Sequence, residues 1–195
     1  MYQVRFHGRG GQGVVTAAEL LSVAAFAEGR HAQAFPSFGS ERMGAPVVSF
    51  CRIADRPIRT REPVTEPDAL VVQDPTLLHQ VDLLRGLRPD GFVVLNSSRP
   101  LAELGLAELA ARLPGGHAVT LPATELAMAH LGRAVPNAAL LGALAGVTGA
   151  VSLQAVQHAF AERFSGALAE ANAAAAADAY RLVHPATEAI GAPTA

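Results

Sequence analysis

Short apolar runs alternate along this chain with longer segments whose apolar residues recur at helical spacing. The runs that predict buried strands lie at 4–7, 31–35, 47–53, 69–73, 91–95 and 117–121. Helical patterns are found at 13–28, 76–84, 101–113, 124–131, 138–148, 153–164 and 167–182. Buried strands separated by helices are typical of parallel sheets covered on both faces. The pattern therefore predicts an α/β fold, a Rossmann-like and mainly parallel sheet covered by helices.

Two segments add to this plan. After the strand at 47–53, the turn-forming residues at 55–57 lead into a short extended piece at 58–60, which predicts a β-hairpin insertion. The last four helical patterns follow the final strand and predict a group of C-terminal helices. With 195 residues, we expect one domain over 1–183 and a loose C-terminal tail over 184–195.

Composition narrows the classes of partner. Only 16% of the residues are charged, half are apolar, and the net charge is −2. The basic residues are all arginines and are scattered, which disfavours a nucleic-acid-binding protein. The bland run at 138–151 is too short to span a membrane. Residues 2–6 already form a core-type strand rather than a signal peptide, so we predict a cytoplasmic protein.

The low charge also bears on assembly, because the cores of protein interfaces are depleted in charged residues. The alanine-rich helices at 138–148 and 153–164 are the segments that we expect to pack against companion subunits. A surface of this kind favours a chain that works as one part of a larger complex.

A glycine-rich loop lies between the first strand and the first helix. Gly8, Gly10 and Gly13 follow the spacing G-x-G-x-x-G, with Arg9, Gly11 and Gln12 between them. Glycines allow a sharp turn and close approach of a phosphate, and the helix N-terminus supplies free N–H groups. We predict that Gly8, Arg9, Gly10, Gly11, Gln12 and Gly13 form an anion-binding loop. The alternative is that the glycines only pack the helix closely on the sheet.

The residues at the end of the second strand indicate which anionic group the loop binds. A dinucleotide-binding fold places Asp or Glu at the end of this strand to hold the ribose. Residues 36–40 contain no carboxylate, and the first one is Glu41. This disfavours NAD. Ser37, Ser40 and Arg42 suit a phosphate instead, so the 2′-phosphate of NADP remains an alternative of lower rank.

No catalytic set and no metal site are predicted. The seven histidines do not cluster with one another or with the single cysteine, Cys51, which lies in a strand and is expected in the core. His7 borders the glycine loop, where a phosphate contact and a packing role are both open. Asp74 and Asn96 end two strands on the edge where α/β proteins bind ligands, but helix capping is the preferred interpretation.

At this point three blocks of sequence resemble a known family, the γ subunits of 2-oxoacid:ferredoxin oxidoreductases. The first is the glycine loop, followed by Ala-Ala-Glu-Leu-Leu at 17–21. The second is Phe-Pro-Ser-Phe-Gly-Ser-Glu-Arg-Met-Gly at 35–44, and the third is Pro-Asn-Ala-Ala-Leu-Leu-Gly-Ala at 136–143. Complexes of this type act on pyruvate, 2-oxoglutarate, indolepyruvate or aryl-glyoxylates.

The resemblance implies a γ subunit without a catalytic centre of its own. In that family, α, β and ferredoxin-like δ companions carry thiamine diphosphate and iron–sulfur clusters, and some complexes add an NAD-reducing flavin subunit. The complex decarboxylates a 2-oxoacid oxidatively to its acyl-CoA and passes the electrons to ferredoxin or NAD. The γ subunit helps to form the coenzyme A site and the subunit interface.

Carried over to this chain, the resemblance assigns two groups of residues to coenzyme A phosphates or to the subunit interface. The first is the glycine loop, and the second consists of Ser37, Phe38, Gly39, Ser40 and Arg42. A stand-alone NADP- or nucleotide-binding reductase is the alternative function. A scaffold that has lost ligand binding is a third, and the intact glycines argue against it.

Overall fold

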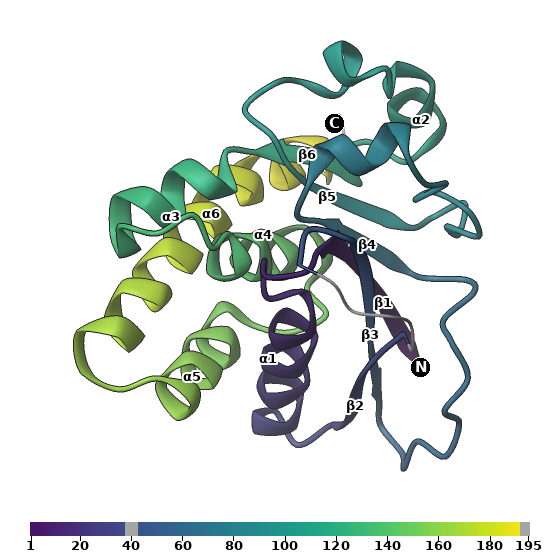
Figure 1. Cartoon of the computed structure of the whole chain (residues 1–195). Helices are drawn as coiled ribbons and strands as arrows, with labels where there is room; N and C mark the ends of the chain where they lie inside the picture. Colours follow the sequence, from purple (N-terminus) through teal and green to yellow (C-terminus); the bar gives the residue numbers. More distant parts are fainter. Residues whose placement is uncertain (38–42, 192–195) are drawn as a thin grey trace.

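A computed structural model describes residues 1–37 and 43–191 of the chain (Figure 1). The described residues contain a six-stranded sheet with the order β2-β3-β1-β4-β5-β6. The strands are β1 (Tyr2–Arg9), β2 (His31–Pro36), β3 (Pro46–Ala54), β4 (Ala69–Val72), β5 (Phe92–Asn96) and β6 (Ala118–Leu121). β1, β4, β5 and β6 pair in parallel, whereas β3 is antiparallel to both β1 and β2. The predicted α/β class and the mainly parallel sheet are confirmed.

The antiparallel hairpin lies elsewhere than expected. It is formed by β2 and β3, which are consecutive in the chain, with Phe35 opposite Phe50. The second arm predicted at 58–60 was wrong, because those residues form no strand. β3 already has a strand on each side, β1 and β2, so no edge of β3 is free to pair with 58–60.

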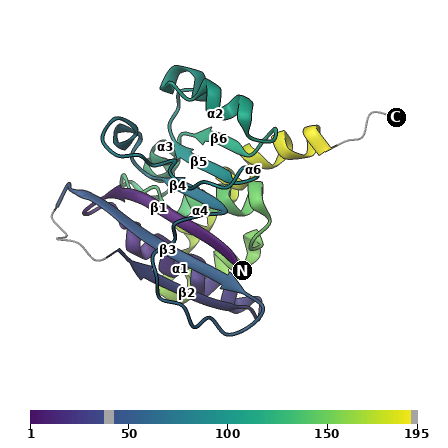
Figure 2. The ribbon, with the colours of Figure 1, turned by 90° about the vertical axis from the view of Figure 1, so that its right-hand side faces the viewer.

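Helices lie together on one side of the sheet (Figures 1 and 2). They are α1 (Val14–Ala27), α3 (Ala123–Leu131), α4 (Asn137–Thr148), α5 (Leu153–Arg163) and α6 (Gly166–Gly191). Val4 and Phe6 of β1 and Val71 of β4 point into this layer and join one large apolar core with it. The opposite face is covered over β4 and β5 by α2 (Ala107–Arg112) and two 3₁₀ turns, η1 (Pro75–His79) and η2 (Leu101–Leu104).

Two predicted helices are shorter than expected. The pattern at 76–84 gives only η1, because its buried residues Leu77 and Leu83 are six positions apart and do not follow one helical stripe. The pattern at 101–113 is split at Gly105, which adopts φ 74° and ends η2 before α2 begins. The C-terminal helix is longer than expected: α6 continues to Gly191, into the segment predicted as tail. The remaining residues, 192–195, lie outside the described part.

α4 is an internal helix of this chain. Every residue from Asn137 to Val147 is buried, and the helix packs closely against α6. The prediction that 138–148 faces companion subunits was therefore wrong for this helix. A helix that is apolar on all sides is a central helix, and here the chain's own α6 supplies the cover. Part of α5, the other helix of that prediction, remains on the surface.

Candidate functional site

The glycine loop lies where the sheet changes direction. It follows β1, whose one neighbour, β4, is parallel and whose other neighbour, β3, is antiparallel. Gly11 and Gly13 adopt φ values of 92° and 76°, and α1 begins directly after Gly13. Such a switch point at the carboxyl ends of parallel strands is the usual ligand site of open α/β sheets. The structure thus puts the predicted loop at the expected edge.

Close packing accounts for part of the glycine pattern. A Cβ on Gly8 would come within 2.7 Å of Val14 Cγ2, and one on Gly13 within 2.6 Å of Asn137 Nδ2. The Asn137 amide donates a 3.0 Å hydrogen bond to the Gly13 carbonyl and so ties α4 to the loop. The packing role of these glycines is real, and it leaves a ligand role on the outer side of the loop open.

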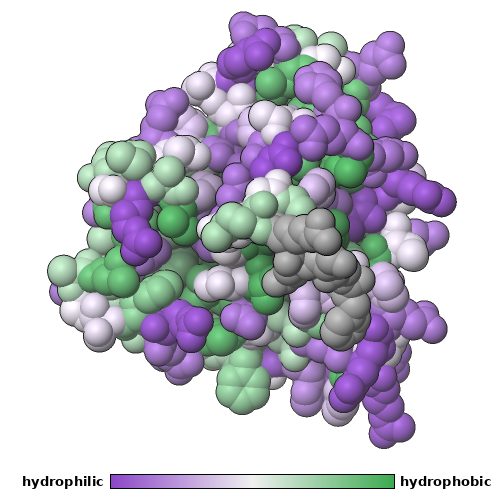
Figure 3. Space-filling view, viewed as in Figure 1, coloured by the Kyte–Doolittle hydropathy of each residue, from purple (hydrophilic) through white to green (hydrophobic). Residues whose placement is uncertain are grey.

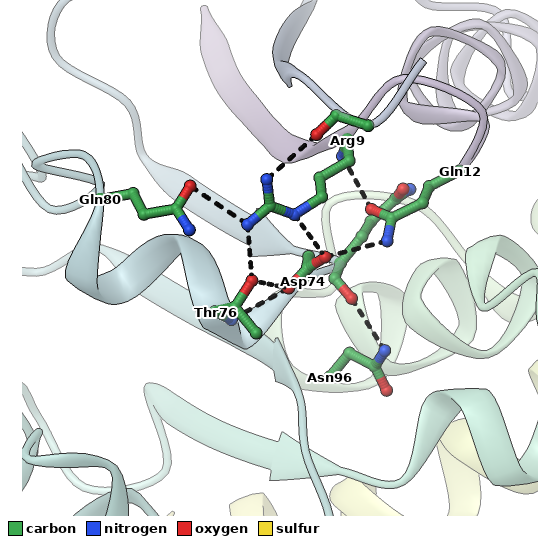
Figure 4. A network of polar contacts seen from close by, with 8 residues as sticks. Arg9, Gln12, Asp74, Thr76, Gln80 and Asn96 are labelled. Carbon is green, nitrogen blue, oxygen red and sulfur yellow. Dashed lines mark hydrogen bonds and ion pairs between the residues drawn. The ribbon is translucent and has the colours of Figure 1, made fainter.

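Arg9 and Gln12 turn their side chains inward (Figure 4). Arg9 Nε lies 3.0 Å from Asp74 Oδ2, and its Nη2 donates to Thr76 Oγ1 and Gln80 Oε1 at 2.7 and 3.1 Å. Gln12 Oε1 accepts from the Arg9 backbone N–H at 2.7 Å, while its Nε2 donates to Asp74 at 3.1 Å. The loop from β1 is thereby locked to the end of β4 and to η1.

This lock occupies the crevice between β1 and β4. The Arg9 side chain is only 22% exposed and Asp74 only 14%. In a dinucleotide-binding sheet the ligand lies across this crevice, so the Arg9–Asp74 pair disfavours the stand-alone reductase. The predicted ligand contacts of Arg9 and Gln12 remain predictions, and both side chains already serve to hold the loop.

The outer side of the loop presents backbone donors that have no acceptor among the described residues. The first intrahelical bond of α1 runs from Ala17 N to Gly13 O at 3.0 Å, so the N–H groups of Val14, Val15 and Thr16 have no intrahelical acceptor. Gly13 provides no side-chain cap. An open depression of about 300 Å³ lies beside them, lined by Arg9, Gly10, Gly11, Gly13, Val14, Val15 and Val47. Free amides and the helix dipole favour an anion here.

The second sequence block, residues 35–44, leads into chain that contacts the glycine loop. Ser37 is exposed, and its backbone N–H donates to Val48 O at 2.9 Å. Phe38, Gly39, Ser40 and Arg42 lie outside the described residues. Beyond them, Gly10 donates to Ala45 O at 2.9 Å and Gly44 donates to Gly10 O at 3.1 Å. The chain that follows the block therefore packs directly on the glycine loop.

Buried amides form the floor beneath the loop, and the sequence analysis did not single out all of them. Gln73, 2% exposed, donates to Asn137 Oδ1 at 2.7 Å. Asn96 donates to Gln73 O and to Thr124 Oγ1, both at 2.8 Å, and accepts from Thr124 N at 3.1 Å. Capping was the preferred role for Asn96 and Asp74, and both cap: Asp74 accepts from Thr76 N at 3.0 Å. Polar residues directly after buried strands were the available signal for Gln73.

His7 and Cys51 belong to the interior. His7 is buried and accepts a 3.0 Å hydrogen bond from Arg5 Nε, so the packing role holds and a phosphate contact does not. Burial, together with the charge of Arg5, lowers the pKa of His7 to about 3. Burial raises the pKa of the Cys51 thiol, as expected for a core cysteine. Within the described ranges, no three metal-ligating side chains come together.

The lock on the loop depends on an ionised Asp74. Burial alone would raise the pKa of this carboxyl, but hydrogen bonds from Thr76 and Gln12 and the charge of Arg9 together hold it below its ordinary value. Asp74→Asn should cost about 1.5–3 kcal/mol of unfolding free energy at pH 7, the range for hydrogen bonds to charged groups. Urea unfolding of the purified chain measures this loss.

The pH dependence of that loss has a definite sign. A carboxyl with a depressed pKa stabilises the fold above its unfolded pKa, near 4, and ceases to do so as the pH falls through its folded pKa. The difference between wild type and Asp74→Asn should therefore shrink below about pH 4. Asp90→Asn is the control, since its pair with Arg88 is exposed. A difference for Asp74 that is independent of pH would contradict the lock.

The fold and the loop define a class, an α/β domain with a glycine-rich loop at the switch point of its sheet. The family described as pyruvate ferredoxin/flavodoxin oxidoreductase matches residues 3–182. The common γ subunit of the pyruvate and ketoisovalerate oxidoreductases of Thermococcus kodakarensis is 50% identical over 180 residues, 92% of this chain and 96% of that protein. The pyruvate synthase subunit PorC of Methanocaldococcus jannaschii is 47% identical over the same shares. The chain belongs to this family.

Solved structures agree with the fold. The pyruvate oxidoreductase subunit PORC of Thermotoga maritima superposes with a TM-score of 0.77 at 33% identity, over 92% of this chain and 95% of that one. The 2-oxoglutarate:ferredoxin oxidoreductase of Magnetococcus marinus, solved with coenzyme A bound, has a TM-score of 0.70 at 16% identity and is covered to 32%. At 16% identity, the similarity to the Magnetococcus marinus enzyme shows a shared fold and nothing more. No helix of the described residues is long and apolar enough to cross a membrane.

Proposed function

We propose that this chain is the γ subunit of a cytoplasmic, multi-subunit, thiamine diphosphate-dependent 2-oxoacid oxidoreductase. The complex would decarboxylate a 2-oxoacid oxidatively to its acyl-CoA and pass the electrons to ferredoxin or NAD through other subunits. Family membership over residues 3–182 supports this role. The relatives named for pyruvate and ketoisovalerate favour a short 2-oxoacid as substrate.

The observation that carries the coenzyme A part is the row of amides at the start of α1 that lack an intrahelical acceptor. Val14 and Val15 line an open depression, Thr16 follows them with a further N–H group, and the Arg9–Asp74 pair holds the loop in that shape. A phosphate group accepts several such hydrogen bonds and benefits from the helix dipole. We assign the glycine loop to the phosphates of coenzyme A, with Ser37, Phe38, Gly39, Ser40 and Arg42 completing the site.

The redox groups belong to companion subunits in this proposal. Iron–sulfur clusters need several thiolate ligands, and the single cysteine of the sequence, Cys51, is fully buried. Thiamine diphosphate would likewise be held by the α and β companions, and the clusters by a ferredoxin-like δ companion. This chain contributes binding surface and geometry, and no catalytic residue.

Hydrogen–deuterium exchange of the assembled complex tests the assignment. Coenzyme A should slow exchange in peptides covering residues 10–17, because the amides of Val14, Val15 and Thr16 then donate to phosphate. Pantetheine, which lacks the nucleotide phosphates, should leave these peptides unchanged. Coenzyme A binding that leaves peptides 10–17 as they were would remove the loop from the site.

Arg42→Ala provides a second test. A guanidinium binds phosphate in a bidentate manner and stays charged at physiological pH. Its loss should cost roughly 1.5–3 kcal/mol of binding, which corresponds to about a 10- to 150-fold rise in the KM for coenzyme A. The yield of the complex is measured beside it. An unchanged KM with poor assembly would assign Arg42 to the subunit interface.

A further inference from the structure

A long connection at the other edge of the sheet has no role in the proposed coenzyme A site. Residues 55–68 join the end of β3 to the start of β4 and contain neither helix nor strand. Because β3 runs opposite to β1, this connection lies at the amino ends of β1 and β4, away from the glycine loop (Figure 1). Ordered connections of this length are uncommon in compact domains and are usually functional.

The second half of the connection is fixed from beneath. Arg52 Nη2 donates to Glu62 O, and Arg5 Nη1 donates to Val64 O at 3.4 Å. Gly86, with φ 75°, lets the chain approach so closely that a Cβ there would lie 1.9 Å from Thr65 O. The connection is therefore held against the body of the domain, and its first half is presented from a fixed base.

That first half carries a concentration of positive charge. Arg56, Arg59 and Arg61 lie within six consecutive residues that include no carboxylate, and no other six-residue stretch of the sequence holds three arginines. All three are exposed. Among the residues whose side chains the structure describes, 1–37 and 43–184, none of them has a hydrogen-bond or ion-pair partner. The neighbouring Asp55 is already engaged by Arg30, with Nε and Oδ1 3.3 Å apart.

Buried positive charges beneath the connection also favour an anionic partner. Arg5 and Arg52 are 8% and 3% exposed, and the described partners of their guanidinium groups are carbonyl oxygens, an imidazole nitrogen and an amide oxygen rather than carboxylates. Asp82 and Glu62 act on these two groups through space and offset part of their charge, and the remainder adds to the field of the exposed arginines above them. Figure 3 shows hydrophilic residues gathered along the right-hand edge of the molecule, where this connection runs.

From these observations we propose that residues 55–61 form a docking surface for a carboxylate-rich face of a companion subunit. A small anion is disfavoured, because Asp55 lines the same shallow depression as Arg56 and Arg59, and Arg61 lies outside it. Charge spread along a fixed, exposed loop suits an extended acidic protein face. The inference rests on the proposed function only in requiring that this chain assembles with companions.

The test measures association of the chain with the purified companion subunits of its own complex. Charged residues at an interface rim act mainly on the association rate and its salt dependence. Arg56→Gln/Arg59→Gln/Arg61→Gln should lower the association rate about 10-fold in 50 mM salt, and in 500 mM salt it should match wild type. The three lysine replacements, which keep the charge, should retain most of the rate.

A matched control removes the same charge elsewhere. Arg99→Gln/Arg112→Gln/Arg133→Gln changes three other exposed arginines and should leave the association rate within about twofold. Equal slowing of association by both triple variants would overturn the docking surface, and so would no slowing by the Arg56/Arg59/Arg61 variant. The same holds if that variant loses binding to an RNA probe while its association with the companions is unchanged. A wild-type chain that never binds the companions would instead refute the proposed function.

Discussion

Gly142→Ala is expected to destabilise this chain more than any other conservative change considered. Gly142 faces α6 across the tightest helix contact of the core: an added Cβ would lie 2.0 Å from the Ala176 carbonyl oxygen and 2.6 Å from its carbon. Both atoms are backbone, so neither can rotate away, and α4 and α6 must separate. Overpacking costs about 1–3 kcal/mol and occasionally more; with backbone on both sides, we expect a loss of about 3 kcal/mol or more.

Urea unfolding of the purified chain measures this loss, and Gly146→Ala is the matched control on the same helix. A Cβ at Gly146 would lie 2.8 Å from Val183 Cγ2 and 3.3 Å from Tyr180 Cδ2 and O, a smaller overlap in which the nearest atom belongs to a side chain and not to the backbone. Alanine is also the better helix former by about 1 kcal/mol, so this variant should stay within about 1 kcal/mol of wild type. Equal stability of the two variants would show that the α4–α6 contact does not limit the fold.

Gly13→Ala is expected to damage both the fold and the use of coenzyme A. Its φ of 76° places an alanine in the left-handed region, at a cost of about 1–2 kcal/mol. The Cβ would also displace Asn137, which loses its hydrogen bond to Gly13 O and disturbs its bond from Gln73. Together we expect about 2–4 kcal/mol of lost stability and, in the complex, a KM for coenzyme A raised at least about 10-fold.

Gly132→Ala separates backbone strain from the site. Gly132 has φ 63°, and a Cβ there meets nothing within 4 Å, so its variant should show the conformational cost alone. Urea unfolding and the KM for coenzyme A are measured for both variants, and decarboxylation is followed separately. If Gly13→Ala raises the KM no more than Gly132→Ala does, the loop does not serve coenzyme A.

The alternation of apolar runs and helical patterns determined the class and order of the fold. Two of the four parallel strands were found from the continuous Val and Leu runs at 69–73 and 91–95, because a strand buried on both faces is apolar along most of its length. The glycine loop, the capping role of Asp74 and the burial of Cys51 were likewise local properties. Each depends on a residue type and its immediate neighbours along the chain.

What only the tertiary structure decided were partners that are distant in sequence. The ligand contact of Arg9 stays a prediction, but only the structure shows that Asp74, 65 positions away, holds its side chain in the sheet crevice. The apolar helix at 138–148 was assigned to an interface, yet α6 covers it within the same chain. The amino-acid composition shows that an apolar helix must be covered and that a charged side chain must be paired. Only the packed chain shows which partner meets it, because contact depends on the path of the backbone between them.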